Sequence, residues 1–299
     1  MALQTQILDG KVLADKVLKE ISAEVERLAH RGMRRPGLCT ILVGDHPASA
    51  LYVKNKRKRA KLVGIQSFHH ELPENVAEAH LLELIEQLNN DKHVDGILVQ
   101  LPLPKHISKS KVIESISPLK DVDGLHPENL GRLFTGRPNL VSCTPLGCMR
   151  ILEEAGISLR GANAVVVGRS NLVGKPMAAL LLNADASTAI CHRYSKDIKD
   201  FTKQADVLVV AAGKPGLITA DHIKAGATII DVGINRLADG SIVGDVDFAS
   251  VQGKAAYITP VPGGVGPMTI AMLLQNTLTT YRLSKAAVSK DKDETNSSL

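Results

Sequence analysis

The segment Val165–Pro176 has the sequence VVVGRSNLVGKP, in which an apolar run leads into a turn bounded by glycines and then into apolar, helix-forming residues. A short apolar run that stops at glycine predicts a buried strand over 164–167, and the spacing that follows predicts a helix over 174–183. Glycines at such a junction let backbone N–H groups and the helix N-terminus face a pyrophosphate. The segment therefore predicts a dinucleotide site in a doubly wound α/β domain.

The glycine spacing leaves another interpretation open. It is not Gly-x-Gly-x-x-Gly, and it fails as a Walker A loop because five residues separate Gly168 from Gly174 and Pro176 replaces Ser or Thr. A plain strand–helix turn in a domain that binds no nucleotide would have the same appearance. The surrounding sequence has to decide between the two.

The sequence on both sides of this segment alternates between helices and apolar strands, which is typical of parallel sheets. Downstream, strands are expected over 187–191, 207–211, 228–232 and 257–259, with helices over 144–155 and near 197–204. Upstream, strands are expected over 38–43 and 96–101, with helices over 9–30 (capped by Asp9), 50–63 (capped by Ser49) and 75–89 (with Glu78 in a capping box). Two α/β modules follow from this alternation. A last helix, 270–283, could belong to either module, and the polar tail 285–299 is expected to be disordered.

Composition narrows the class of protein. The chain has 299 residues, of which 44% are hydrophobic and 22% charged, and no apolar stretch approaches the roughly 20 residues of a membrane helix. Its four cysteines form no Cys-x-x-Cys pair, so neither a disulfide framework nor a metal site is expected, and a reducing compartment fits better. The net charge of +5 suits an anionic ligand better than nucleic acid.

The residues after the next predicted strand favour NADP over NAD. No acidic residue stands at the tip of that strand, where NAD-binding folds place one to hold the ribose hydroxyls. Arg193 and Arg169 would instead offer two guanidinium groups to a 2′-phosphate. The loop 212–216, which follows the strand after that, would lie at the same sheet edge and could pass close to the dinucleotide.

Candidate acid–base residues lie in the first module. Tyr52 and Lys56 are four residues apart on a predicted helix, so both point the same way, just beyond the carboxyl end of the first strand. Gln100 ends another strand, and Asp123 lies near a turn soon after it. The alternatives are a solvated basic helix face, a hydrogen-bonding residue at a strand end and a turn-capping aspartate. Together the four side chains could converge on one cleft.

Near the C-terminus, residues 259–269 have the sequence TPVPGGVGPMT. Proline fixes φ and removes a donor, while glycine permits close backbone approach, so this segment cannot be an ordinary strand or helix. It is expected to be a rigid loop against which a ligand can lie. A tight interdomain turn is the alternative.

Together these segments resemble the bifunctional methylenetetrahydrofolate dehydrogenase/cyclohydrolases, the FolD family. The resemblance extends from about Ile7 to Arg282, in the order found in the family. The matching motifs are Pro47-Ala48-Ser49 with Tyr52-Val53 and Lys56, Val99–Pro104, Lys120–Gly124, Cys143-Thr144-Pro145 with Gly147, Val167–Ser170 with Val173-Gly174 and Pro176, and Pro260–Thr269.

The resemblance implies a folate-binding catalytic domain over 1–143, completed by the helix 268–284, and a Rossmann-like NADP domain over 144–267. It implies NADP-dependent oxidation of 5,10-methylenetetrahydrofolate and hydrolysis of the methenyl product to 10-formyltetrahydrofolate, in the one-carbon metabolism that supplies purine biosynthesis. It also implies a folate cleft between the domains and a homodimer formed through the NADP domain. No metal, nucleic acid or membrane partner is expected.

The resemblance also implies residue roles. Lys56 is the catalytic residue, Tyr52 stacks on the folate, Gln100 positions Lys56, and Asp123 holds the pterin edge. The folate site is completed by Ser49, Leu101, Pro262, Gly263 and Gly266. The residues expected at the NADP site are Gly168, Arg169, Ser170, Val173, Gly174, His192, Arg193, Ser195, Gly213 and Ile234.

Two rival functions are weighed against this one. A dehydrogenase acting on another small molecule would keep the NADP site but would not oxidise methylenetetrahydrofolate. A dinucleotide-sensing regulatory protein would need an effector or DNA-binding module, and no helix-turn-helix pattern is found. A cytoplasmic location is expected, with a mitochondrial address left open and the ending Ser297-Ser298-Leu299 only weakly similar to a peroxisomal signal.

Overall fold

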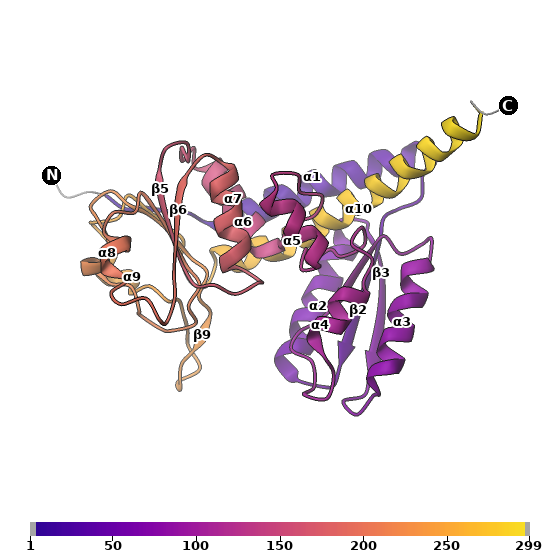
Figure 1. Cartoon of the computed structure of the whole chain (residues 1–299), viewed down its shortest axis with the longest axis horizontal. Helices are drawn as coiled ribbons and strands as arrows, with labels where there is room; N and C mark the ends of the chain where they lie inside the picture. Colours follow the sequence, from indigo (N-terminus) through magenta and orange to yellow (C-terminus); the bar gives the residue numbers. More distant parts are fainter. Residues whose placement is uncertain (1–3, 297–299) are drawn as a thin grey trace. The chain divides into compact units, whose positions relative to one another are not determined.

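The computed structural model describes the backbone of residues 4–296, and it describes the side chains within that range except at 48 and 286–296. The chain divides into two compact units. One, here called the six-stranded unit, contains residues 4–16, 133–137 and 142–272. The other, the three-stranded unit, contains 17–132, 138–141 and 273–296 (Figure 1).

The six-stranded unit is built on a parallel sheet in the order β1-β11-β8-β7-β5-β6. Figure 1 shows α6 and α7 on one side of this sheet and α8 and α9 on the other, as in a doubly wound fold. The strands are β1 (Gln6–Ile7), β5 (Asn163–Val167), β6 (Ser187–Cys191), β7 (Val207–Val210), β8 (Thr228–Asp231) and β11 (Tyr257–Ile258). The helices are α6 (Cys143–Glu154), α7 (Gly174–Asn183), α8 (Lys199–Thr202), the 3-10 turn η1 (Ala220–His222) and α9 (Phe248–Val251).

The central strands of this sheet are apolar because both faces are covered. β7 and β8 are buried along their whole length, and one face of the sheet packs residues such as Val165, Leu208 and Ile229 into a continuous core. A small antiparallel hairpin, β9 (Asn235–Arg236) with β10 (Ile242–Val243), follows β8. The sequence predicted the long strands within one or two residues, but it missed this hairpin and the short strand β1.

The three-stranded unit contains a parallel sheet in the order β3-β2-β4, formed by β2 (Gly37–Val43), β3 (Gln66–Leu72) and β4 (Gly96–Val99). The helices of this part of the chain are α1 (Gly10–His30), α2 (Pro47–Leu62), α3 (Glu78–Asn90), α4 (Lys109–Ser115) and α5 (Pro127–Phe134). β2 is central and buried throughout, which explains its apolar sequence. β3 is an edge strand with the partly exposed sequence QSFHHEL, so its composition did not predict a strand.

The last helix, α10 (Val265–Asn296), begins in the six-stranded unit and belongs to the three-stranded unit from Leu273 onward. There the Asn276 amide donates to the carbonyls of Val122 and Val141, at 2.8 Å each. Arg282 forms an ion pair of 2.7 Å with Glu24 of α1, and this contact lowers the pKa of Glu24. The prediction that the last helix returns to the first module is confirmed.

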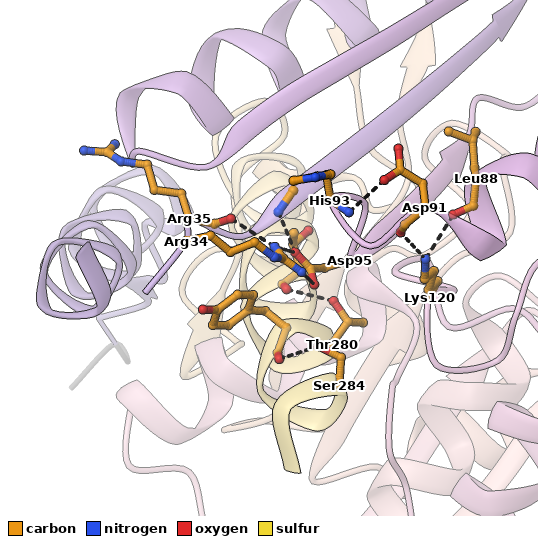
Figure 2. Close-up of polar contacts among 12 residues, drawn as sticks. Arg34, Arg35, Leu88, Asp91, His93, Asp95, Lys120, Thr280 and Ser284 are labelled. Atoms are coloured by element: carbon orange, nitrogen blue, oxygen red, sulfur yellow. Dashed lines mark hydrogen bonds and ion pairs between the residues drawn. The ribbon is translucent and has the colours of Figure 1, made fainter. Parts of the chain in front are cut away.

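A polar cluster joins the beginnings of β2 and β4 to α10 (Figure 2). The two terminal nitrogens of the Arg34 guanidinium donate to the Asp95 carboxylate, at 2.6 and 2.7 Å, and the backbone N–H of Gly37 donates to it at 2.7 Å. The guanidinium also lies over the Tyr281 ring, 5.0 Å from its centroid. Beside this cluster, Lys120 donates to two backbone carbonyls, and burial lowers the pKa of its ammonium group.

Two predicted helix starts were wrong. α2 begins at Pro47 rather than after a Ser49 cap, because proline is already set for the first helical position and Ser49 is buried inside the first turn. α3 begins at Glu78, whose carboxylate accepts from the Ser108 backbone at 2.6 Å and pairs with Lys111 at 2.9 Å. Glu78 therefore serves the start of α4 and forms no capping box with Asn75.

The unit bounds differ from the predicted 1–143 with 268–284, and from the predicted 144–267, because residues 4–16, 133–137 and 268–272 belong to the six-stranded unit. β1 pairs with β11, so residues 4–16 join the six-stranded unit. The backbone of α10 continues through residues 285–296, part of the segment for which composition predicts disorder. The ending Ser297-Ser298-Leu299 lies outside the described residues. Among the helices that are described, none combines the length and apolarity required to cross a bilayer.

Candidate active site

Lys56 and Gln100 meet at the carboxyl end of the three-stranded sheet. Lys56 lies on α2, which follows β2, and Gln100 directly follows β4. The Lys56 ammonium donates to Gln100 Oε1 at 3.0 Å, while Gln100 Nε2 donates to the Leu101 carbonyl at 2.7 Å. Because the second bond uses the amide nitrogen, it turns the amide oxygen toward the lysine. The predicted pairing of these two residues is present.

The other predicted residues of this unit have different environments. Tyr52, one turn before Lys56 on α2, is 47% exposed. Ser49 is buried, and Leu101 is half-buried. An exposed aromatic ring beside a hydrogen-bonded lysine is an arrangement that can hold a flat substrate next to a proton donor.

Asp123 lies in a loop held by contacts that the sequence did not predict. Asp121 is buried and accepts from the His126 backbone at 2.7 Å and from the Asn129 amide at 3.0 Å. Burial raises the pKa of the Asp121 carboxyl group. On the other side of the loop, Asn276 holds the Val122 carbonyl. The half-buried Asp123 is thus carried on a braced turn.

The proline- and glycine-rich segment that begins at residue 259 forms a packed turn of the six-stranded unit before α10 starts at Val265. The Gly264 N–H donates to the Pro260 carbonyl at 2.8 Å, and the Lys11 N–H donates to the Gly263 carbonyl at 3.0 Å. Gly263 has φ of +108°, and a Cβ on Gly10 would clash with the Gly264 carbonyl. Pro262 is exposed, and Gly266 is half-buried at the start of α10. Backbone geometry requires glycine at Gly10, Gly263 and Gly264, whereas a Cβ on Gly266 would meet no close neighbour.

The turn after β5 requires glycine at both ends. A Cβ on Gly168 would clash with the Ala211 carbonyl, and a Cβ on Gly174 would clash with the carbonyl of Gly168. Ser170 Oγ accepts from the Val173 N–H at 3.1 Å, which closes the turn before α7 begins at Gly174. The result is a tight backbone cradle at the N-terminus of a ten-residue helix. This geometry fits a pyrophosphate.

Two arginines gather at the neighbouring strand ends. The guanidiniums of Arg169 and Arg193 lie 5.5 Å and 4.7 Å from the centroid of the Tyr194 ring. The strand end itself is closed by the His192 N–H, which donates to Ser195 Oγ at 3.0 Å. Tyr194, which sequence reasoning missed, is 66% exposed and keeps both cations in one place. Such a pair suits a phosphate monoester.

Comparison with known proteins agrees with this geometry. Residues 8–123 match the family model of the tetrahydrofolate dehydrogenase/cyclohydrolase catalytic domain, and residues 142–285 match that of its NAD(P)-binding domain. The chain belongs to the tetrahydrofolate dehydrogenase/cyclohydrolase family. The resemblance found from the motifs is therefore confirmed.

Individual relatives are similar over nearly their whole length. The bifunctional protein FolD of Wolinella succinogenes is 57% identical over 273 residues, which cover 91% of this chain and 96% of that protein. The crystal structure of FolD from Campylobacter jejuni has a TM-score of 0.92 and 50% identity, covering 94% of this chain and 99% of that one. The Trypanosoma brucei enzyme, solved with NADP cofactor and inhibitor, has a TM-score of 0.90 and 42% identity, covering 94% and 98%.

Within this family fold, the remaining predicted cofactor residues lie on two loops of the six-stranded unit. Gly213 has φ of +66° in an exposed loop after β7, and Ile234 is 55% exposed between β8 and β9. All four cysteines are buried and free, and burial raises the pKa of the Cys148 thiol to about 12. No group of His, Cys, Asp and Glu suited to a metal ion is found among the described residues.

Proposed function

We propose that this chain catalyses two consecutive reactions of one-carbon folate metabolism. The first is the NADP-dependent oxidation of 5,10-methylenetetrahydrofolate, and the second is the hydrolysis of 5,10-methenyltetrahydrofolate to 10-formyltetrahydrofolate. The observation that carries the proposal is the hydrogen bond between Lys56 and Gln100 beside the exposed Tyr52, in a chain whose two units match both domains of the family. The product would supply one-carbon groups for purine biosynthesis.

The oxidation depends mainly on positioning. A hydride leaves the methylene carbon, and the resulting cation is stabilised by N5 and N10 of the folate. When bound, NADP supplies the hydride acceptor. The chain's own task is to hold the folate ring against Tyr52 and to hold the pterin edge at Asp123, so that the reacting carbon is correctly oriented. No proton donor is needed for this reaction.

The hydrolysis needs a group that moves protons, and Lys56 is the candidate. Water adds to the methenyl carbon and loses a proton, the bond from that carbon to N5 breaks as the formyl carbonyl forms, and N5 gains a proton. One proton of the water thus ends on N5, and the other is released to solvent. An amine held within reach could accept the first proton and return one to N5, which is typically worth about 10²–10⁴-fold in rate. Gln100 keeps that amine in place.

The residues that we assign to NADP lie in loops at the carboxyl ends of the strands of the six-stranded sheet. We assign the pyrophosphate to the cradle formed by Gly168 and Gly174, where a helix N-terminus offers backbone N–H groups. Arg169 and Arg193 are assigned to the 2′-phosphate, because two guanidiniums held against one ring provide bidentate donors for it. Ser170, Val173, His192, Ser195, Gly213 and Ile234 complete the assigned set.

We further propose a homodimer formed through the six-stranded unit. β6 is one of the two edge strands of the sheet, and Ile190, Phe201 and Leu182 on or near it are 41%, 45% and 57% exposed. Exposed apolar groups beside an open strand edge are typical of an association surface. Light scattering of the purified protein at two concentrations tests the dimer.

We also propose a cytoplasmic location. The four reduced, buried cysteines fit the cytoplasm, which keeps thiols reduced.

Replacement of Lys56 by methionine tests the catalytic assignment. The variant should lose methenyl hydrolysis, measured from the loss of methenyl absorbance, because a thioether cannot accept and return a proton as an amine does. Lys54→Met on the same helix is the matched control and should hydrolyse at the parental rate. Parental hydrolysis in the Lys56 variant would contradict the assignment. NADPH formation with methylenetetrahydrofolate separates this function from the two rivals, since neither a dehydrogenase for another substrate nor a regulatory protein would form it.

A further inference from the structure

Asp245 is a fully buried carboxylate that none of the roles above uses. It stands between β10 and α9, and its side chain accepts four hydrogen bonds. A buried carboxylate costs free energy unless its oxygens are satisfied, so the donors around it are significant. They come from two different loops, and each loop carries one of the assigned NADP residues.

The first loop follows β7 and contains Gly213. Asp245 Oδ2 accepts from the backbone N–H groups of Ala212 at 2.7 Å and Gly213 at 2.9 Å, and Oδ1 accepts from that of Lys214 at 2.9 Å. Three successive amides can point at one carboxylate only in a curled backbone, and the positive φ of Gly213, +66°, supplies the curl. Residues 212–214 are exposed to solvent, but their backbone N–H groups donate to the buried Asp245 carboxylate.

This loop adjoins the pyrophosphate cradle. The carbonyl of Ala211, the residue that begins the loop, occupies the place where a Cβ of Gly168 would lie. A shift of the loop would therefore disturb the turn after β5. Asp245 is therefore linked to the cradle indirectly. Its carboxylate accepts from the Ala212 N–H, and the preceding carbonyl, that of Ala211, lies against Gly168.

The second loop joins β8 to β9 and contains Ile234. Asn235 Nδ2 donates to Asp245 Oδ1 at 2.8 Å, immediately after the exposed Ile234. A second buried carboxylate, Asp231, accepts from the Gly233 N–H at 2.9 Å and from the Asp245 N–H at 3.0 Å. The close approach requires glycine, because a Cβ on Gly233 would clash with the Asp245 carboxylate. The two aspartates are therefore coupled, because Asp231 holds the backbone N–H groups of both Gly233 and Asp245.

We infer that Asp245, supported by Asp231, is a positioning residue that holds the Ala212–Lys214 loop and the Gly233–Asn235 loop in the conformation that binds NADP. The inference rests on the proposed function. A carboxylate is required because its two oxygens both accept, whereas asparagine would turn an NH₂ group toward backbone N–H donors. One of the two loops would then lose its anchor.

Replacement of Asp245 by asparagine tests the inference. The dissociation constant of NADP, measured by calorimetry, and its KM should both rise about 10-fold or more, since hydrogen bonds to a charged acceptor are lost. Hydrolysis of methenyltetrahydrofolate in the absence of NADP should stay within twofold of the parent. Asp247→Asn, two residues away, is the matched control: Asp247 is exposed and caps α9 at the Ser250 N–H, so NADP binding should not change.

A second variant keeps the test decisive if Asp245→Asn does not fold. Asn235→Ala leaves Asp245 in place and removes the amide that donates to Asp245 Oδ1 at 2.8 Å, together with its longer bond of 3.5 Å to the Val243 carbonyl. This variant should weaken NADP binding several-fold with normal hydrolysis. Unchanged NADP binding in a folded variant would overturn the inference, and so would a parallel loss of both activities, which indicates a general structural role. Parental protein that binds NADP but does not oxidise methylenetetrahydrofolate would refute the proposed function, while the binding measurements would still decide the role of Asp245.

Discussion

Replacing Gln100 by leucine should selectively slow the hydrolysis. The change removes both the acceptor that lies 3.0 Å from the Lys56 ammonium and the donor that orients the amide toward it. A hydrogen bond to a charged group contributes about 1.5–3 kcal/mol. At about 1.36 kcal/mol per decade, its loss corresponds to about a 10- to 150-fold fall in kcat/KM. Lys56 is only half-buried, so water can replace part of the bond, and we expect the lower end of that range.

The assay is the decay of methenyl absorbance at several substrate concentrations without NADP. NADP-dependent oxidation of methylenetetrahydrofolate should fall much less, because it needs no proton transfer. Gln100→Glu retains an acceptor but pairs an added charge with Lys56 and holds it protonated, so hydrolysis should also fall. Gln87→Leu, on the exposed face of α3, is the matched control. Hydrolysis by Gln100→Leu within twofold of the parent would refute the view that Gln100 positions the lysine.

Three further predictions concern the cofactor site and stability. Arg193→Ser should raise the KM for NADP about 10-fold and change the KM for NAD little, because one phosphate contact is lost; equal effects on both cofactors would argue against a 2′-phosphate site. Asp95→Ala should lower the free energy of unfolding by about 3–5 kcal/mol, measured by urea denaturation, because it leaves the Arg34 guanidinium unpaired and partly buried. Burial raises the pKa of Asp231 to about 6 from 3.8, so its contribution to stability is full below pH 3.8 and is lost as the pH rises through about 6. That loss is on the order of 3 kcal/mol. As the pH rises through this window, the Tm of the parent should therefore fall relative to the Tm of Asp231→Asn.

Local patterns in the sequence were sufficient to predict the central elements of both sheets. The strands over 164–167 and 207–211 are uninterrupted apolar runs, and both lie in the parallel sheet. Buried parallel strands need apolar side chains on both faces, which makes the composition informative. β3 and the β9–β10 hairpin lie at edges or outside the layers, where partly exposed polar residues carry no such signal.

The same distinction between local pattern and tertiary packing applies to the residues of the candidate sites. Tyr52 and Lys56 could be found because helical spacing brings them to one face, and the Gly168–Gly174 turn could be found because backbone geometry requires those glycines. Tyr194 and Asp245 could not be found. Their partners are chosen by how strands and loops pack, and the Asp245 partners lie 10 to 33 positions away in the chain.

The amino-acid sequence by itself therefore determined the class of fold, the parallel strands, the glycine-bounded turn after β5 and the expectation of NADP as cofactor, because each depends on neighbours within one or two elements. Only the tertiary structure decided that Gln100 turns its oxygen to Lys56, that α10 returns to the three-stranded unit and that two buried aspartates anchor the loops after β7 and β8. These are hydrogen bonds between distant segments, and the directions of their donors and acceptors exist only after the chain has packed.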